Sequence, residues 1–231
     1  MQDKYCLPII AKEAQAVLSK IERYSNEYAY FEVWLDYLTV PDMRFIRGLT
    51  GRLPGKLIFV FRRKELEPTR LSHERRLEII EALDHMPVYI DLDLKDQFAE
   101  LETLKAEQLH LEIITSYHNY QETPNDDELR DIIMTMKTYN PAIVKIATYC
   151  RNETDALRLL TLQLALKELG QRHVILGMGE QGVITRIFGT MWSNEFIFAP
   201  QHTEDASAPG QLTRRQLDAI FHVLLPSKTV E

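Results

Sequence analysis

Short apolar runs and segments of helical periodicity alternate along the whole chain, and this alternation constrains the fold more than any single motif does. Eight runs have the length and composition of β-strands: residues 5–10, 29–36, 56–62, 87–93, 109–118, 142–148, 173–178 and 195–200. Apolar residues recur at helical spacing in the segments 11–25, 72–84, 95–107, 125–139, 152–170 and 211–225. Strands that alternate with helices form parallel sheets through right-handed crossovers. Eight such units in 231 residues predict an α/β fold, a closed (β/α)8 barrel of the TIM type.

Local sequence signals mark the ends of two predicted helices, and no linker divides the chain into domains. Thr123 precedes Pro124 and an acidic turn, which predicts a helix N-cap, and Gly170 ends a long helical segment as a C-cap. A doubly wound open sheet is the alternative fold, but no GxGxxG or GxxxxGK[ST] phosphate loop follows the first strand. No linker rich in Pro, Gly or Ser divides the sequence, so we expect residues 1–231 to form a single barrel domain.

The charge and the cysteine content narrow the partners and the compartment. The formal net charge is −7 and the basic residues form no clustered block, so neither nucleic acid nor an anionic membrane is an expected partner. No apolar run approaches the roughly 18 to 20 residues of a membrane-spanning helix, and the start of the chain lacks the pattern of a secretion signal. Cys6 and Cys150 are the only cysteines, which is typical of reduced thiols and predicts a cytoplasmic protein.

Polar residues lie late in several predicted strands, where the active site of such a barrel is built. They are Glu32, Asp36, Arg62, Asp91, Asp93, Ser116, His118 and Lys145. Residues two apart in a strand share one side, so Lys145 lies with Ile143 and Ala147 and is expected to point into the barrel. The same alternation groups Glu32 with Trp34 and Asp36.

A lysine inside an apolar strand needs a reason, because an ammonium is costly to bury. Burial is expected to lower the pKa of Lys145 and to provide a neutral amine that forms a Schiff base with a ketone or aldehyde. His118, on the adjacent strand, is the candidate base and acid, and Glu32 could orient its imidazole. Taken singly, each of these residues also has a structural explanation, as an ion-pair partner or a satisfied polar group. The seven histidines show no HxH or HExxH spacing, so metal catalysis is not expected.

The same residues resemble the signature of a known family. Residues 91–119, DLDLKDQFAELETLKAEQLHLEIITSYHN, are similar to the type I 3-dehydroquinate dehydratase signature, in which a short acidic strand and a spacer precede S-x-H-[DN]. Further matching pieces occur in the family's order: FEVWLD (31–36), FVFR (59–62), TP (123–124), VKIAT (144–148), MGEQGVITRIFG (178–189) and ASAPGQ (206–211). The resemblance covers essentially the whole chain.

The resemblance implies an enzyme of the shikimate pathway that dehydrates 3-dehydroquinate to 3-dehydroshikimate. The reaction implied is a syn elimination through an iminium, without a metal or an organic cofactor, and a homodimer is common in the family. By the matching motifs, Lys145 is the Schiff-base lysine and His118 the general acid and base. Glu32 matches the acidic residue that helps to position the histidine and the substrate.

The motifs also imply the residues that bind the substrate. Arg62 matches the arginine after the third strand of the family's pocket. Arg186, in GVITR, matches an arginine expected to bind the substrate carboxylate as a fixed cationic fork. Ser207 and Gln211, in SAPGQ, match the loop that closes over the substrate and contacts its hydroxyl groups.

The chain departs from the family pattern near these residues. Trp34 stands where the family usually has an arginine, and an indole donates one hydrogen bond but carries no charge. After Arg62, neither Glu65 nor Glu67 aligns convincingly with the glutamate of the family's loop. Two other functions therefore stay open: a class I aldolase acting on a phosphorylated sugar, which also uses a Schiff-base lysine, and a non-catalytic barrel kept for binding or assembly.

Overall fold

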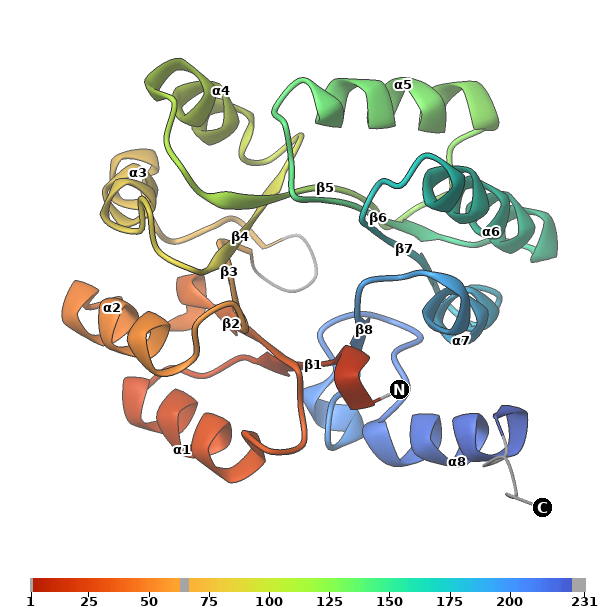
Figure 1. Cartoon of the computed structure of the whole chain (residues 1–231), viewed down its shortest axis with the longest axis horizontal. Helices are drawn as coiled ribbons and strands as arrows, with labels where there is room; N and C mark the ends of the chain where they lie inside the picture. Colours follow the sequence, from red (N-terminus) through yellow and green to blue (C-terminus); the bar gives the residue numbers. More distant parts are fainter. Residues whose placement is uncertain (1, 63–66, 226–231) are drawn as a thin grey trace.

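All eight predicted strands form, and they lie side by side in one barrel (Figure 1). The computed structural model describes residues 2–62 and 67–225. The strands are β1 (Tyr5–Ile9), β2 (Tyr30–Trp34), β3 (Leu57–Val60), β4 (Tyr89–Asp93), β5 (Glu112–Asn119), β6 (Ile143–Tyr149), β7 (His173–Met178) and β8 (Ile197–Phe198). The helices are α1 (Ala14–Tyr24), α2 (Met43–Arg52), α3 (His73–Ala82), α4 (Phe98–Glu107), α5 (Asp126–Lys137), α6 (Glu153–Glu168), α7 (Val183–Trp192) and α8 (Arg214–Leu224). Short 3-10 turns are η1 (Gln2–Lys4), η2 (Leu35–Tyr37) and η4 (Thr203–Asp205).

The strands follow one another around the barrel in sequence order. Each strand from β1 to β6 pairs in parallel with the next one, and β8 pairs in parallel with β1. The ladder is therefore open between β7 and β8, where a backbone hydrogen bond from Glu195 N to His173 O (2.9 Å) joins the two edges. The chain is a nearly closed (β/α)8 barrel, as the alternation predicts, and the doubly wound sheet is excluded.

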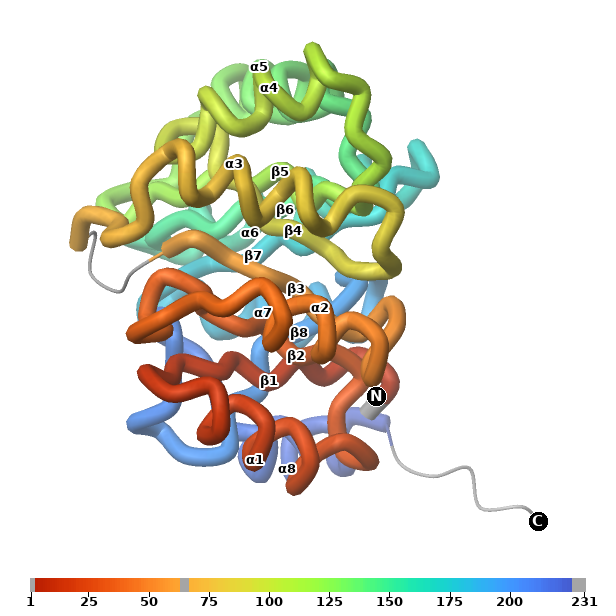
Figure 2. The backbone as a smooth tube through the Cα atoms, turned by 90° about the vertical axis from the view of Figure 1, so that its left-hand side faces the viewer, coloured from red at the N-terminus to blue at the C-terminus, as the bar shows by residue number. Residues whose placement is uncertain are grey.

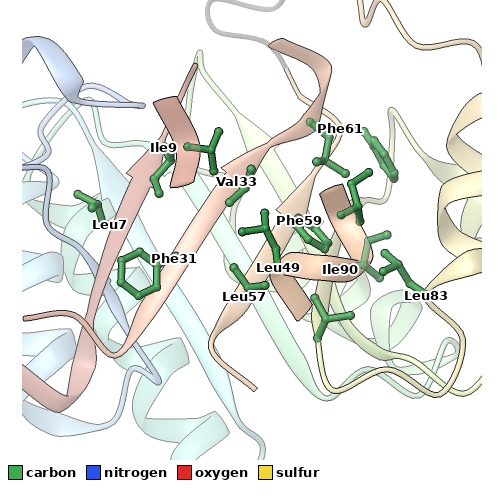
Figure 3. Close-up of a cluster of buried hydrophobic side chains, with 14 of the residues drawn as sticks. Leu7, Ile9, Phe31, Val33, Leu49, Leu57, Phe59, Phe61, Leu83 and Ile90 are labelled. Atoms are coloured by element: carbon green, nitrogen blue, oxygen red, sulfur yellow. The ribbon is translucent and has the colours of Figure 1, made fainter. Parts of the chain in front are cut away.

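The helices surround the strands and cover a continuous apolar layer. Seen from the side, α4 and α5 lie outside β4 and β5, while α1 and α8 lie outside β1 at the opposite end of the view (Figure 2). Phe31 and Val33 of β2 pack beside Leu57 and Phe59 of β3 in this layer (Figure 3). Each fully buried side chain of this kind contributes about 1.5–3 kcal/mol to stability.

Alternation along β6 places Lys145 on the inner side of the barrel. Its neighbours Val144 and Ile146 belong to the cluster that packs against α5 and α6. Ile143, two residues before Lys145, belongs instead to the interior cluster with Ile58 of β3 and Val174 of β7. The predicted inward direction of Lys145 is therefore confirmed.

The predicted N-cap of α5 is wrong by two residues. Asn125 caps the helix, because its side chain accepts from Glu128 N (3.0 Å) while the Glu128 carboxylate accepts from Asn125 N (3.0 Å). This reciprocal pair satisfies two backbone donors of the first turn, which Thr123 is too far along the chain to reach. The Thr123 hydroxyl lies 2.9 Å from Thr148 Oγ1 and donates to Tyr149 O at 3.0 Å, so it joins the loop to β6.

Asp36 does not share a strand face with Glu32, which corrects a second expectation. β2 ends at Trp34 and the chain turns into η2, so the alternation of the strand no longer applies. The buried Asp36 carboxylate accepts from Arg70 N (2.8 and 2.9 Å) and from Leu71 N (2.9 Å). Asp36 therefore holds the segment before α3.

The end of α6 agrees with the prediction, whereas two helices have no counterpart in the periodic segments. Gly170 follows α6 with a φ of 66°, the left-handed conformation that favours glycine after a helix. The helices α2 and α7 carry glycines at positions 48, 51 and 189, which weakens their helical signal. Within residues 2–62 and 67–225, no helix is both long and apolar enough to cross a membrane.

Candidate active site

Every side chain that the sequence assigns to the site lines one cavity at the carboxyl ends of the strands. The eight residues are Glu32, Trp34, Arg62, His118, Lys145, Arg186, Ser207 and Gln211. The cavity measures about 30 Å³. A larger hollow of about 510 Å³ shares Arg62, His118 and Tyr120 with it. The structure therefore brings together the eight residues that the sequence motifs name, although they come from different strands and loops. The cavity between them is narrow.

Lys145 lies in the middle of β6 and is only 2% exposed. Its Nζ is 2.6 Å from Asp91 Oδ2 and 3.4 Å from Glu32 Oε1. The same atom lies 4.8 Å from the centre of the Phe198 ring, within the range of a cation–π contact. Two carboxylates and an aromatic face thus replace the water around this cation.

The expected lowering of the Lys145 pKa is wrong. Burial does lower the pKa of this ammonium, but the charges of Asp91 and Glu32 outweigh burial, and the pKa is raised above its ordinary value. The sequence could not reveal this balance, because the two carboxylates come from β4 and β2, far from β6 in the chain. At pH 7 the resting lysine is therefore protonated and must lose a proton before it can act as a nucleophile.

Asp91 joins Lys145 to a second cation. Its Oδ1 accepts from Ser116 Oγ (2.5 Å) and from Arg62 Nη2 (3.4 Å), and Arg62 Nη2 also donates to Ser116 Oγ (3.2 Å). Burial raises the pKa of Asp91, but the charges of Lys145 and Arg62 outweigh burial and hold it well below its usual range. Asp91 is therefore a fixed anion between two fixed cations, which makes it a poor proton acceptor at pH 7.

His118 is held by Asp93 of the neighbouring strand β4. Its Nδ1 is 2.7 Å from Asp93 Oδ2, whereas Glu32, the expected orienting residue, is bonded to Trp34 and Lys145. Burial and the charge of Arg62 lower the pKa of His118 to about 4, although Asp93 acts in the opposite direction. The imidazole is therefore neutral at pH 7, and with Nδ1–H donated to Asp93 its Nε2 is left as the basic nitrogen.

Trp34 lies where the family pattern has an arginine, and it makes a defined contact. Its indole Nε1 donates to Glu32 Oε2 at 2.7 Å, while the other oxygen of Glu32 faces Lys145. The indole ring also meets Tyr37 edge-on, with centroids 6.0 Å apart. Trp34 thus fixes the rotation of the Glu32 carboxylate.

Arg186 presents a buried guanidinium toward the cavity with much of its hydrogen-bonding capacity unused. It is 2% exposed, and its Nη2 donates to Pro209 O at 3.1 Å. Among the described residues, its Nε and Nη1 have no hydrogen-bond partner. Burial lowers the pKa of Arg186 to about 10, which still leaves it charged at pH 7. A buried cation with two unpartnered donors is suited to an anionic group of a ligand.

Ser207 and Gln211 belong to the loop between η4 and α8 and bind each other. Gln211 Oε1 accepts from Ser207 N (2.9 Å), and Gln211 Nε2 donates to Ser207 Oγ (2.9 Å). Gly210 of this loop has a φ of 78°, and a Cβ there would lie 2.7 Å from Gly179 O. Only glycine fits this approach without strain, so the loop sits close to the segment after β7.

Of the two glutamates that the sequence names after Arg62, the structure describes one. Glu67 lines the larger hollow together with Lys95 and Asn119. Glu65 lies outside the described residues.

Two late-strand carboxylates belong to the site although the sequence pattern predicts no role for them. Asp91 holds Lys145, and Asp93 holds His118. Both lie on the inner side of β4, and the strand register puts Asp93 opposite Ser116 and Ser116 opposite Lys145. The alternation of DLD was therefore a usable signal for both residues.

The arrangement can perform amine chemistry followed by proton transfer. A lysine that can form an imine and a neutral histidine that can take a proton face one cavity, and a charged arginine beside them can hold an anion. The carboxylates of β4 keep each group in place. This combination suits a substrate that has both a carbonyl and a carboxylate.

Comparison with known proteins points to one family. The family model described as type I 3-dehydroquinase matches residues 5–227. A 3-dehydroquinate dehydratase of Thermococcus onnurineus is 32% identical over 220 residues, covering 94% of this chain and 96% of the relative. A 3-dehydroquinate dehydratase of Methanococcus maripaludis is 28% identical and covers 95% of this chain and 99% of its own.

Solved structures of similar proteins have the same fold. The 3-dehydroquinate dehydratase of Geobacillus kaustophilus matches with a TM-score of 0.78 at 21% identity, covering 97% of this chain and 92% of that one. The enzyme of that name from Enterococcus faecalis matches with a TM-score of 0.71 at 25% identity, covering 85% of this chain and 88% of its own.

Proposed function

The chain belongs to the type I 3-dehydroquinase family, and from this premise we propose that it dehydrates 3-dehydroquinate to 3-dehydroshikimate through a Schiff base on Lys145. One observation carries the proposal: Lys145 and His118 face the same cavity, each held by a carboxylate of β4. The names of the curated relatives support the substrate and its place in the shikimate pathway. No metal or organic cofactor takes part in the proposed reaction.

The first step joins Lys145 to the ketone of the substrate. The ammonium gives up a proton, the amine adds to the carbonyl carbon, and the same proton returns to the carbinolamine hydroxyl, which leaves as water while the C–N bond becomes an iminium. The iminium carries a positive charge at nearly the position of the former ammonium. Asp91 and Glu32, which raise the pKa of Lys145, therefore also stabilise this intermediate.

The second step uses His118 twice. Its Nε2 takes a proton from the carbon next to the iminium, and the electron pair moves to the nitrogen as an enamine. The pair then returns, the β-hydroxyl leaves, and the imidazolium returns its proton so that water departs from the same face. Hydrolysis of the remaining imine releases the product and restores Lys145. The low pKa of His118 makes the imidazolium a strong acid for the departing hydroxyl.

Arg186 is the proposed anchor for the substrate carboxylate. Its unpartnered Nε and Nη1 would gain charge-assisted hydrogen bonds when the anion binds. Ser207 and Gln211 are proposed to contact substrate hydroxyls, and Arg62 and Trp34, which line the same cavity, are proposed to contact the substrate as well.

Reduction of the imine tests the proposal directly. Borohydride added during turnover should attach the substrate carbon skeleton to Lys145, as seen by mass spectrometry of peptides, and the protein with 3-dehydroquinate should produce the absorbance of a conjugated enone. Lys145→Ala should abolish both signals, while Lys12→Ala, at an exposed lysine, should leave both intact. His118→Ala should still allow trapping but slow elimination by about 100- to 10,000-fold. The proposal fails if no enone forms and Lys145 keeps its mass.

The same assay separates the other two functions. A class I aldolase would trap a phosphorylated sugar on Lys145 and release a cleavage product without forming an enone. A non-catalytic barrel would bind 3-dehydroquinate without imine trapping. Buried Lys145 and neutral His118 argue against the second alternative, because a binding protein gains nothing from a cation that is costly to bury.

We also propose that the protein is a homodimer. Exposed apolar residues on two neighbouring helices are the proposed interface. Leu157 of α6 and Ile184 and Trp192 of α7 are exposed on two helices that pack side by side. Leu157→Glu should convert a dimer to a monomer in sedimentation velocity, whereas Val40→Glu, at another exposed apolar residue outside this face, should not. A monomeric parent protein would refute the dimer.

The proposed place of action is the cytoplasm, where thiols stay reduced. Cys6 and Cys150 are free and buried. Cell fractionation tests this assignment, and recovery of the protein only outside the cytoplasm would contradict it.

A further inference from the structure

Two turns at the amino-terminal ends of β4 and β5 bring together one aspartate and two histidines. Asp84 and His85 follow α3, and His110 lies between α4 and β5. The candidate ligand atoms of these three residues all lie within 4.8 Å of one another. Because β4 and β5 begin near this cluster and end near His118, it lies at the opposite end of the barrel from Lys145.

Backbone hydrogen bonds hold the two turns against each other. His85 N donates to His110 O at 3.1 Å, and His110 N donates to Asp84 Oδ1 at 2.7 Å. The two imidazoles are stacked, with centroids 4.4 Å apart and planes 15° from parallel. His85 has a φ of 60°, a left-handed conformation that costs energy for any residue with a Cβ. The turns are therefore fixed in a strained arrangement that presents both rings on the same side.

One pair of candidate ligand atoms in the cluster has a spacing close to that of a transition-metal site. His85 Nε2 is 3.6 Å from Asp84 Oδ2, whereas two ligand atoms of a tetrahedral zinc ion with bonds of about 2.0–2.1 Å lie about 3.3 Å apart. The stacked rings direct their in-plane nitrogen lone pairs side by side, so the His85 imidazole, which is 69% exposed, must rotate out of the stack for both nitrogens to face one ion. Asp84 Oδ2 is the oxygen that does not accept from His110 N, which leaves it available as a ligand.

The charge and the open space around the Asp84, His85 and His110 cluster are compatible with a bound cation. The cluster borders an open hollow that Arg172 also lines. Arg172 donates to Glu195 Oε1 (2.7 Å) and to Tyr89 Oη (3.0 Å), so its positive charge is directed toward a carboxylate and not toward the histidines. The hollow leaves room for water molecules to complete the coordination.

We propose that Asp84, His85 and His110 bind one divalent transition-metal ion, such as Zn²⁺ or Ni²⁺, which clamps the turn after α3 to the turn after α4. Two imidazoles and one carboxylate favour these ions over Mg²⁺ and Ca²⁺, which prefer oxygen ligands alone. The ion stabilises the folded chain and takes no part in chemistry at the other end of the barrel. The site does not depend on the proposed dehydratase activity.

Isothermal titration calorimetry of the full chain with Ni²⁺, Zn²⁺ and Mg²⁺ tests the site. One Ni²⁺ or one Zn²⁺ should bind per chain, while Mg²⁺ should give no saturable heat. At a free metal concentration 100-fold above Kd, the ratio of folded to unfolded protein should rise about 100-fold in urea denaturation. Co²⁺ should give visible absorption bands that report imidazole coordination.

The variants are chosen to keep the turns folded. His85→Asn retains a residue that tolerates positive φ, Asp84→Asn retains the oxygen that accepts from His110 N, and His110→Gln leaves that backbone donor unchanged. Each should weaken Ni²⁺ binding at least tenfold, whereas His222→Gln on α8 should leave Kd unchanged. The absence of saturable Ni²⁺ and Zn²⁺ binding, or an unchanged Kd in all three cluster variants, would overturn the proposal.

Discussion

At the scale of single residues, the strongest determinant of reactivity is the charge that Asp91 places beside Lys145. Because this charge raises the pKa of the ammonium, imine formation in the wild type should require a higher pH than a buried lysine alone would. In Asp91→Asn the pH dependence of borohydride trapping should shift to lower pH. Glu32→Gln should shift it in the same direction but less, since Glu32 lies 3.4 Å from Nζ and Asp91 lies 2.6 Å away. A profile that does not move in Asp91→Asn would contradict this account.

Asp93 determines which nitrogen of His118 is basic. A carboxylate accepts the Nδ1 proton and leaves Nε2 free, whereas an amide at the same position can donate to Nδ1 and reverse the tautomer. Asp93→Asn should therefore reduce kcat by about 100- to 10,000-fold while imine trapping on Lys145 persists. Single-turnover kinetics with and without borohydride separates the two steps. Loss of trapping as well would mean that the substitution damages the pocket and not only the tautomer.

Trp34 stabilises the protein through its bond to Glu32. A hydrogen bond to a charged group contributes about 1.5–3 kcal/mol, so Trp34→Phe should lower the free energy of unfolding by about that amount while keeping an aromatic ring in the pocket. Urea denaturation at pH 7 measures the change. Phe98→Leu, at an exposed aromatic residue on α4, is the control and should change the free energy little. Equal stabilities of the two variants would show that the indole donor is not needed.

At the scale of elements, Asp36 connects the end of β2 to the segment before α3. It accepts from two backbone donors, Arg70 N and Leu71 N, and Arg76 holds the same segment through Leu71 O at 2.6 Å. Asp36→Ala removes the buried, charged acceptor of these bonds and should lower the free energy of unfolding by about 1.5–3 kcal/mol, the contribution of a hydrogen bond to a charged group. Because the segment borders the hollow beside the site, KM should rise more than kcat falls.

Steady-state kinetics and urea denaturation of the same preparation check this prediction. Asp131→Asn, at an exposed carboxylate on α5, is the control and should behave as the parent protein does. If Asp36→Ala lowers stability without any change in KM, the segment has no role in substrate binding.

The elements and their facing directions could be predicted from the sequence, because both depend on local pattern. The period of two along β6 was enough to turn Lys145 inward, and family motifs were enough to gather eight residues around one cavity. The pKa of Lys145 could not be predicted, since it depends on the positions of carboxylates in β2 and β4. Asp36 was misassigned because the chain leaves the strand two residues earlier, where alternation ceases.

At the scale of the whole molecule, the residues proposed to carry the chemistry and the residues that stabilise the fold lie in different parts of the barrel. The carboxyl end collects buried charges, including Lys145, Arg62, Asp91 and Asp93, that are expensive to hold in place. The apolar layer between strands and helices supplies the stability that this requires. The stability of the folded state should therefore depend on pH through the buried titratable groups of the strands.

The lowered pKa of His118 determines the direction and the pH range of this dependence. Its pKa in the folded protein is lowered to about 4, from an ordinary value of about 6.5, so the unfolded chain binds a proton first as the pH falls. The associated stability is complete above about pH 6.5 and is lost progressively down to about pH 4, in total about 3 kcal/mol. Between pH 7 and pH 5, the free energy of unfolding should fall by about 2 kcal/mol from this group.

Urea denaturation between pH 7 and pH 5 tests this prediction. Two substitutions separate the contribution of His118 from that of other groups. His118→Gln removes the titrating group and should flatten the dependence, whereas His222→Gln at an exposed histidine should not. Burial also lowers the pKa of His173, which contributes with the same sign, so part of the slope should remain in His118→Gln. An undiminished slope in His118→Gln would mean that His118 is not held neutral by the fold, and the proposed base would then lose its physical support.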